Sequence, residues 1–171
     1  MNDKNKILKE RAKALARASE TKVSALAGVE FLEFGLAHEK YAIEACHVRE
    51  VYPLKRITPV PCTPPFVLGI INLRGQICSV IDIKKLIGLP HTATSESSKV
   101  IVVFNDKMEV GILADDVVGV RKFLLSEIKD DLSSHKAKEE YLSGVTVERV
   151  GILDIGKLLG DDSVVVYEEV D

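Results

Sequence analysis

The chain has 171 residues, of which 46% are hydrophobic and only 5% aromatic, with no tryptophan. This length and apolar content predict one ordinary globular domain or two very small ones, and the shortage of aromatic side chains argues against a large cofactor cavity. The formal net charge is −3 with both signs scattered, unlike the concentrated positive charge of a nucleic-acid-binding domain, so we expect neither a nucleic-acid partner nor a cofactor.

The cysteines and the start of the chain indicate the compartment. Cys46, Cys62 and Cys78 are widely spaced and form no C-x-x-C pair, so we expect free, buried thiols in a reducing environment. The chain begins without the apolar run of a signal peptide, and nowhere do 18 apolar residues follow one another. These features predict a soluble cytoplasmic protein that does not insert directly into a membrane.

Residues 1–22 are predicted to form a basic amphipathic helix. The segment is rich in strong helix formers, and Asn2 or Asp3 can cap its first turn. Its apolar side chains fall on one side of the helix, namely Ile7, Leu8, Ala12 and Leu15. Because this stripe is thin and carries no Trp or Phe anchor, we favour solvation, or docking onto its own protein, over membrane binding.

The remainder, residues 23–171, is predicted to be mainly β. From Val29 onward, short runs of Val, Ile, Phe and Leu alternate with polar residues and are separated by turn signals, which is typical of many short antiparallel strands. Five prolines between Pro53 and Pro65 predict an extended connection that cannot lie in the centre of a sheet. The polar segment Pro90–Ser98 predicts a long surface loop.

An internal repeat divides this mainly β region. Residues 76–88 and 148–160 share the pattern D-I-x-K-L-h-G without a gap, where h is an apolar residue. Upstream, residues 43–51 align with 112–120 at Ile, Ala and Val positions, and the order of the matches is the same in both halves. The sequence therefore predicts a duplicated β unit whose boundary lies near the polar loop. The two predicted units, between which elements can be exchanged, are 29–89 and 99–160.

The shared D-I-x-K-L-h-G pattern predicts a very short helix after a strand in each unit. Asp82 and Asp154 can accept hydrogen bonds from the free amide groups of the first helical turn. Gly88 and Gly160 can adopt the left-handed conformation that ends such a helix. We therefore interpret the two aspartates as helix caps and not as a catalytic pair.

Motifs of catalytic and metal sites are absent from the sequence. There is no G-x-x-x-x-G-K-[ST], no G-x-G-x-x-G and no H-E-x-x-H. The four histidines lie far apart, at His38, His47, His91 and His135. Cys46 and His47 are neighbours, but adjacent residues on a strand point to opposite faces. We therefore expect no catalytic residues and no metal site.

Three pairs of adjacent aspartates could suggest calcium. They stand at 115–116, 130–131 and 161–162. None has the alternating oxygen ligands of a calcium-binding loop. We interpret all three pairs as solvated surface charge.

One segment resembles a known family. Residues 66–90, with an N-L-R-G turn between two apolar runs, are similar to the most characteristic segment of the chemotaxis coupling proteins, the CheW family. Residues 30–51 resemble the opening strands of that family and residues 99–120 its central hairpin. The sequence YLSGV followed by GILDIGKLL resembles the last strands of that family. The resemblance therefore extends over roughly Val29 to Leu159.

This resemblance implies a fold and a function. The fold is mainly β, with two packed, small, five-stranded, SH3-like barrels, an N-terminal helix and short capped helical turns. The function is that of a non-enzymatic adaptor, which couples the cytoplasmic tips of methyl-accepting chemoreceptors to a CheA-type histidine kinase in signalling arrays. It implies a cytoplasmic protein recruited to the inner face of the membrane through those arrays.

The resemblance also assigns partner-binding residues. The positions that match its receptor-binding region are Val48, Glu50, Val51, Gly69, Asn72 and Arg74. The positions that match its kinase contacts are Val100, Gly111 and Val117. Arginine suits receptor binding because its planar guanidinium can pair with a carboxylate or main-chain oxygens in a fixed orientation. The alternative for Arg74 is a solvated turn residue or a salt bridge within its own protein, and for the valines a place in the core.

Two other functions remain open at this point. One is an adaptor for a chemosensory-like pathway that controls pili or a second messenger. The other, from a different class, is a small enzyme with a site between the barrels, for which Cys46, His47 and Asp115 or Asp116 are the candidate groups.

Overall fold

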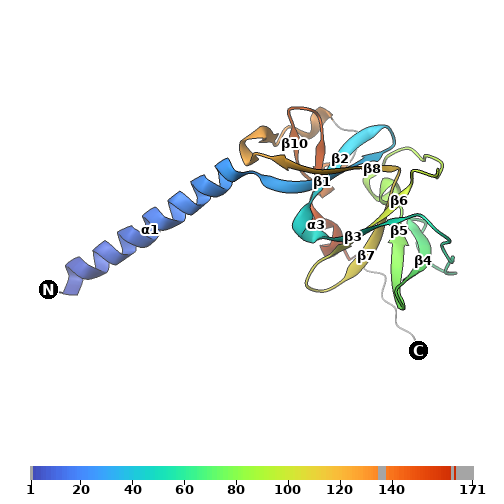
Figure 1. The fold of residues 1–171 in the computed structure, drawn as a ribbon, viewed down its shortest axis with the longest axis horizontal. Helices are drawn as coiled ribbons and strands as arrows, with labels where there is room; N and C mark the ends of the chain where they lie inside the picture. The colour runs from blue at the N-terminus through green and yellow to red at the C-terminus, as the bar shows by residue number, and fades with distance from the viewer. Residues whose placement is uncertain (1, 135–137, 163, 165–171) are drawn as a thin grey trace.

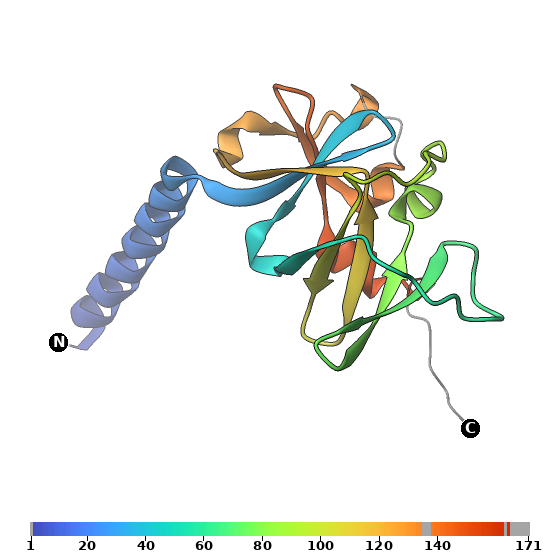
Figure 2. The same cartoon turned by 45° about the vertical axis from the view of Figure 1, so that its right-hand side comes forward.

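A long helix projects from a β body in the computed structural model, which describes residues 2–134, 138–162 and 164 (Figure 1). This helix, α1 (Asn2–Ala27), extends beyond the predicted end at residue 22. Gly28, with a φ of 72°, supplies the left-handed residue that follows it. Residues 4–17 are all exposed, and the second view shows the helix standing clear of the body (Figure 2). The apolar stripe of α1 is therefore exposed to solvent in this structure, and it does not dock onto the β body.

The β body consists of two sheets. The six-stranded sheet has the order β8-β1-β2-β11-β10-β9. Its strands are β1 (Val29–Leu36), β2 (Glu39–Glu44), β8 (Asp116–Phe123), β9 (Ile128–Lys129), β10 (Leu142–Thr146) and β11 (Gly151–Leu153). The five-stranded sheet has the order β3-β6-β7-β5-β4. Its strands are β3 (Val48–Pro53), β4 (Val67–Leu73), β5 (Gln76–Ile81), β6 (Lys99–Phe104) and β7 (Glu109–Ala114).

Short helical segments connect these strands. The α-helices are α2 (Ile83–Ile87) and α3 (Ile155–Gly160), and the 3₁₀ turns are η1 (Ala45–His47), η2 (Leu125–Glu127), η3 (Leu132–Ser134) and η4 (Glu139–Tyr141). Together with the two sheets and α1, they confirm the predicted fold class.

The two sheets exchange elements along the chain. The strands β1 and β2 belong to the six-stranded sheet, together with β8 to β11, while β3 to β7 form the five-stranded sheet. The chain crosses between the sheets at η1, after β2, and again at Asp115, between β7 and β8. The Pro90–Ser98 loop separates β5 from β6, which belong to the same sheet. The sheets therefore do not divide at this loop, and the repeat is built by the exchange of strands.

The repeat has the same register in both sheets. Parallel pairing joins Val80 of β5 to Gly111 of β7 in one sheet, and Ile152 of β11 to Ala42 of β2 in the other. Val80 and Ile152 occupy equivalent positions of the repeat in the sequence. Each sheet thus pairs the last strand of one unit with the middle of a strand from the other unit.

The predicted helix caps are largely as expected. Asp82 accepts a hydrogen bond from the amide of Lys84 at 3.2 Å, and Asp154 accepts one from the amide of Lys157 at 3.0 Å. Gly88 is left-handed, with a φ of 78°. The prediction for Gly160 is wrong, because this residue is the last of α3 and Asp161, in an extended conformation, follows it as the C-cap.

In the part of the chain that the structure describes, apolar residues form three buried clusters. The largest, which we call the main core, combines both sheets with α2 and α3 and includes Phe34, Tyr41, Ile101, Ile112 and Leu158. A second cluster lies on the other face of the five-stranded sheet, with Leu73, Cys78, Val80, Val100, Val102 and Leu113. The third belongs to the six-stranded sheet, with Phe31, Ala42, Phe123, Val150 and Ile152. The central strands of the five-stranded sheet are therefore buried on both faces.

Candidate partner-binding surface

The tip of the β4–β5 hairpin presents Arg74. Leu73 pairs with Gln76, which leaves Arg74 and Gly75 as a two-residue loop with φ angles of 53° and 86°. Both residues are left-handed, as hairpin loops of this length prefer, and Gly75 adopts this conformation at little cost. The side-chain oxygen of Asn72 accepts a hydrogen bond from the amide of Gly75 at 2.8 Å. Asn72 therefore fixes the turn, while the Arg74 side chain is 79% exposed.

Arg74 forms an ion pair with Glu50. Their closest atoms, Nη2 of Arg74 and Oε2 of Glu50, lie 3.3 Å apart. Glu50 is on β3, at one edge of the five-stranded sheet, and the hairpin includes β4 at the other edge. The structure thus brings together two of the residues assigned to receptor binding. The salt bridge within its own protein, an alternative for Arg74, is present, and most of the guanidinium side chain remains accessible.

The valines of β3 differ in exposure. Val51 is 37% exposed, whereas Val48 is partly buried and packs against the main core. Their neighbour Glu50 has 24% of its side chain exposed. Of the three β3 residues assigned to receptor binding, Val51 and Glu50 are accessible to a partner. Val48 contributes mainly to packing.

Gly69 has a backbone role. It is buried, with a φ of 146°, and a Cβ placed on it would lie 2.2 Å from the carbonyl oxygen of Thr58. Thr58 pairs with Ile70 through two backbone hydrogen bonds of 2.9 and 2.8 Å. Gly69 thus allows the proline-rich connection to cross closely over β4. Gly69 is therefore a packing residue of the backbone in this structure, and its assignment to receptor binding stays a prediction.

An apolar groove lies beside the Arg74 hairpin. The parallel pairing of β5 with β7 includes only Val80–Gly111 and Ile81–Ile112, so the preceding residues of the two strands are not paired with each other. A groove of about 490 Å³ lies at this place, and the apolar residues that line it include Val67, Ile70, Ile77, Met108 and Val110. Ile77 is 68% exposed. Sequence reasoning did not identify this groove, which depends on where the parallel pairing stops.

Two of the three predicted kinase contacts are buried. Val100 is 1% exposed, Gly111 is buried, and a Cβ on Gly111 would lie 2.7 Å from Cγ1 of Val100. Both residues therefore serve the packing of β6 against β7, and their assignment as kinase contacts stays a prediction. Val117, on β8 of the other sheet, is partly buried and packs against the main core.

Exposed valines lie next to Val117. Val118 and Val120 are 55% and 60% exposed. Their strand, β8, is an edge of the six-stranded sheet, so one side of its backbone is available for pairing. The sequence signal for this outward face is the alternation in DVVGVRKF, which matches the alternating exposure of β8.

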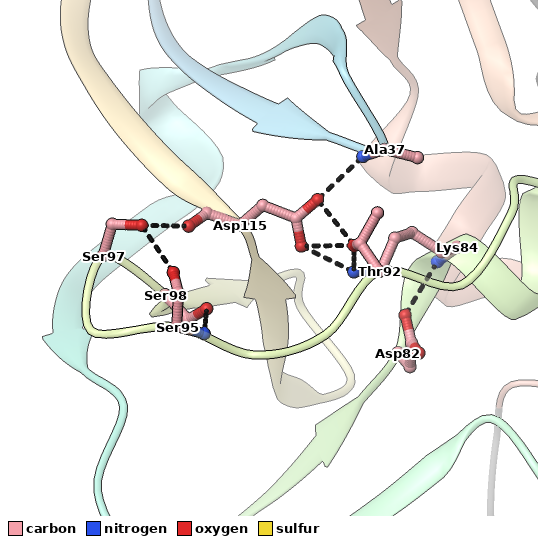
Figure 3. Close-up of polar contacts among 8 residues, drawn as sticks. All are labelled: Ala37, Asp82, Lys84, Thr92, Ser95, Ser97, Ser98 and Asp115. Atoms are coloured by element: carbon pink, nitrogen blue, oxygen red, sulfur yellow. Dashed lines mark hydrogen bonds and ion pairs between the residues drawn. The ribbon is translucent and has the colours of Figure 1, made fainter.

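A partly buried polar cluster fixes the second crossing between the sheets (Figure 3). The Nζ atom of Lys84, whose side chain is 1% exposed, donates to Oδ1 of Asp115 at 2.6 Å and to the hydroxyl of Thr92 at 2.6 Å. The amide of Ala37 donates to Oδ2 of Asp115 at 2.7 Å. The cluster therefore ties the β1–β2 turn, α2 and the Pro90–Ser98 loop to one carboxylate.

The protonation of Asp115 reflects this cluster. Burial raises the pKa of Asp115, but the hydrogen bonds from Lys84, Ala37 and Thr92 outweigh it, so the pKa lies below its ordinary value. The interpretation of the 115–116 pair as solvated surface charge is therefore wrong for Asp115. Asp116 is exposed, as that interpretation expects.

The candidate groups for an enzyme do not form a catalytic arrangement. Burial, followed by the hydrogen bond and the charge of Glu44, raises the pKa of the Cys46 thiol, which is the opposite of what an activated nucleophile requires. Asp115 is engaged by Lys84. Cys46 and His47 lie in the 3₁₀ turn η1 and not in a strand, so the argument that their side chains must face apart is wrong.

The cysteines are free, as predicted, but only one is buried. Cys78 lies in the cluster inside the five-stranded sheet, whereas Cys46 and Cys62 are exposed. Burial, followed by the charge of Glu109, raises the pKa of Cys78 to about 11. Within the described ranges, no helix is both long enough and apolar enough to serve as a transmembrane segment.

Comparison with known proteins identifies similar chains. The family model of the CheW-like domain matches residues 30–163. The chain is 33% identical to the chemotaxis protein CheW of Klebsiella aerogenes over 147 residues, covering 84% of this chain and 89% of that protein. It is 32% identical to the chemotaxis protein CheW of Thermotoga maritima over 149 residues, covering 85% and 97%.

A solved structure has the same fold. The scaffolding protein TtCheW of Thermoanaerobacter tengcongensis matches with a TM-score of 0.68 at 30% identity, over 75% of this chain and 85% of that one. A relative with a different name is protein FrzA of Myxococcus xanthus, which is 26% identical over 135 residues, or 76% of this chain and 84% of FrzA.

Proposed function

This chain belongs to the CheW-like domain family, and we propose that it is a non-enzymatic adaptor that couples chemoreceptor tips to a CheA-type histidine kinase. Support comes from the relatives named as chemotaxis proteins and from the solved structure named as a scaffolding protein. On this proposal, the protein works in the cytoplasm and is recruited to the inner face of the membrane through receptor arrays.

The observation that carries the proposal is the exposed Arg74 next to an apolar groove. The turn holds the guanidinium at the end of the β4–β5 hairpin, and the strands of that hairpin line the groove. A receptor tip with an apolar ridge and a nearby carboxylate would match both features, since arginine pairs with carboxylates in a fixed orientation. Glu50 and Val51 extend this surface along β3.

The remaining receptor-binding predictions act through the shape of this surface. Asn72 fixes the turn that presents Arg74, and Gly69 allows the proline-rich connection to lie against β4. Val48 packs against the main core beneath β3. Gly69 and Val48 therefore support the receptor surface through packing, whereas Asn72 is exposed beside Arg74 and is itself available to a receptor.

The kinase, in our proposal, binds the edge of the six-stranded sheet at β8. Val118 and Val120 supply exposed apolar area, and Val117 packs beneath them against the main core. An exposed strand edge with apolar side chains is a common surface for pairing with another chain. Because β8 and the Arg74 hairpin belong to different sheets, one adaptor can bind both partners at once.

A pathway other than flagellar chemotaxis is a second candidate. This candidate is an adaptor of a chemosensory-like pathway that controls pili or a second messenger. The similarity to FrzA, a relative with a different name, is the reason to retain it. The same two surfaces would operate in either pathway. Pull-down from the source cell, followed by identification of the recovered kinase and receptors, distinguishes the two candidates.

The direct test compares the chain with Arg74→Ala and with Arg149→Ala. Arg149 is an exposed arginine with a φ of 62°, in the hairpin between β10 and β11, so it is a matched control for residue type and backbone conformation. We expect Arg74→Ala to lose receptor fragments and to retain a CheA-type kinase, while Arg149→Ala retains both. Recovery of neither partner by the unaltered chain would contradict the proposal.

A further inference from the structure

Three side chains with metal-binding atoms meet at η1. This turn follows β2 of the six-stranded sheet and precedes β3 of the five-stranded sheet. The ligand atoms of Glu44, Cys46 and His47 all lie within 4.8 Å of one another. A strand would separate Cys46 from His47, but the tight 3₁₀ turn brings both toward Glu44. The arrangement therefore depends on the local backbone conformation, and no sequence motif predicts it.

The separation of these atoms suits a tetrahedral metal ion. The Sγ atom of Cys46 lies 3.5 Å from Oε2 of Glu44. In a tetrahedral zinc site, bonds of about 2.3 Å to sulfur and about 2.1 Å to oxygen place these two atoms about 3.6 Å apart. The thiol and the carboxylate thus already have the required spacing. The ligand atom of His47 lies within 4.8 Å of both, and Glu44 and Cys46 are exposed side chains whose rotamers can adjust.

His47 is oriented by a neighbouring strand. Its Nδ1 atom lies 3.4 Å from the carbonyl oxygen of Phe104, at the end of β6. Since a carbonyl oxygen only accepts, this contact assigns the proton to Nδ1 and leaves Nε2 able to bind a metal. A backbone carbonyl that holds the other ring nitrogen is a common feature around metal-binding histidines.

The charge and the exposure of the cluster also fit a cation. Within the described part of the chain, Glu44 forms no ion pair, so its carboxylate is not neutralised by a lysine or arginine. Glu44 and Cys46 are exposed, which leaves room for water as a fourth ligand. A carboxylate, an imidazole and a cysteine sulfur that loses its proton on metal binding together favour zinc over magnesium or calcium, which prefer oxygen ligands alone.

We propose that Glu44, Cys46 and His47 bind one zinc ion at the crossing between the two sheets. The ion would join the end of β2 to the start of β3 and so stabilise the turn between them. This site is separate from the proposed function, because it requires neither receptor nor kinase.

The test uses the full-length, untagged chain after treatment with a chelator. Co²⁺ is added as a spectroscopic probe for zinc, and Zn²⁺ is then titrated in by calorimetry. We expect one ion per chain, a thiolate-to-cobalt charge-transfer band, and a higher unfolding midpoint with excess Zn²⁺, because a ligand that binds the folded state stabilises it. Cys46→Ser and His47→Ala should each lose the band and weaken Zn²⁺ binding at least tenfold.

Matched variants separate this site from other surface ligands. Cys62→Ser changes the other exposed free thiol, and His91→Ala changes an exposed loop histidine. Both should bind like the unaltered chain. Far-UV circular dichroism without metal verifies that each variant is folded. The proposal is overturned if the unaltered chain gives no charge-transfer band, or if folded Cys46→Ser keeps the band while Cys62→Ser loses it.

Discussion

Arg74 and Glu50 connect the tip of the β4–β5 hairpin to β3 through an ion pair of 3.3 Å. The arginine is 79% exposed, so water and salt screen the pair and it contributes little to folding. The same exposure leaves the guanidinium accessible to a partner. A carboxylate on a binding partner can therefore compete for Arg74 at a small energetic cost to the protein.

We expect Arg74→Ala to weaken receptor binding strongly while the free energy of unfolding changes by no more than about 0.5 kcal/mol. The substitution removes an oriented charge and opens no cavity. Titration with a receptor-tip fragment measures the first effect, and urea unfolding measures the second. The Arg149→Ala control should leave receptor binding unchanged. A folded Arg74→Ala that binds the fragment like its parent, or that loses kinase and receptor equally, rules out the assigned role.

Gly69→Ala should destabilise the fold by roughly 2–4 kcal/mol, because its Cβ would overlap the carbonyl of Thr58 in a conformation that side chains rarely adopt. Gly75→Ala provides the matched control. Gly75 is also left-handed, but nothing lies within 4 Å of the added Cβ, so we expect a cost of only about 1 kcal/mol. Urea denaturation of both variants measures the difference, and equal costs would mean that close packing against Thr58 is unimportant.

These residues indicate what the sequence could predict. The turn at Gly75 and the caps at Asp82 and Asp154 follow from local chemistry, and each was predicted correctly. The conformation of Gly69, in contrast, could not be predicted from the local sequence. Its conformation depends on a proline-rich connection that crosses β4, and a crossing between distant segments leaves no local pattern.

The burial of Val100 and Gly111 could not be predicted from the sequence for a related reason. Alternation in a strand shows that its two faces differ, but it does not show that a second sheet covers the other face. In β6 and β7, both faces are buried, so residues taken as surface contacts are core. The same limit explains Asp115, whose partner Lys84 is 31 residues away.

Asp115→Asn should lower the free energy of unfolding by roughly 1–3 kcal/mol near neutral pH, since it removes the charge that satisfies buried Lys84. The folded pKa of Asp115 lies below its ordinary value of 3.8. Its stabilising contribution is therefore complete above that value and is lost as pH falls through the folded pKa. Urea unfolding at several pH values should show that the difference in free energy of unfolding between variant and parent decreases below about pH 4.

The exposed neighbour supplies the control for that pH series. Asp116→Asn should have nearly the same stability as its parent at every pH, because Asp116 is exposed. If Asp115→Asn behaves like Asp116→Asn at neutral pH, the cluster around Lys84 does not stabilise the crossing.

Deletion of residues 1–19 should leave the β body with a cooperative unfolding transition and a midpoint close to that of the full chain. Residues 4–17 are exposed, so their removal uncovers no core surface. Differential scanning calorimetry of the two proteins tests this. Loss of cooperativity in the truncated protein would mean that α1 packs against the body in solution.

Substitutions in β8 test the proposed kinase surface. Val118 is 55% exposed, so Val118→Lys should preserve the fold and weaken binding to the regulatory domain of a CheA-type kinase by roughly tenfold or more. Val147, which is 63% exposed in the β10–β11 hairpin, gives the matched control Val147→Lys, for which we expect parental affinity.

Val117→Lys should behave differently, because Val117 packs against the main core and a charge there lowers stability by about 2 kcal/mol or more. The kinase affinity of Val117→Lys can therefore be interpreted only if thermal unfolding shows that this variant is folded. Val118→Lys avoids this ambiguity, since its side chain already lies at the surface. If folded Val118→Lys and its control Val147→Lys bind the kinase equally well, the kinase does not use the β8 edge. Receptor binding should survive Val118→Lys, because the Arg74 hairpin lies in the other sheet.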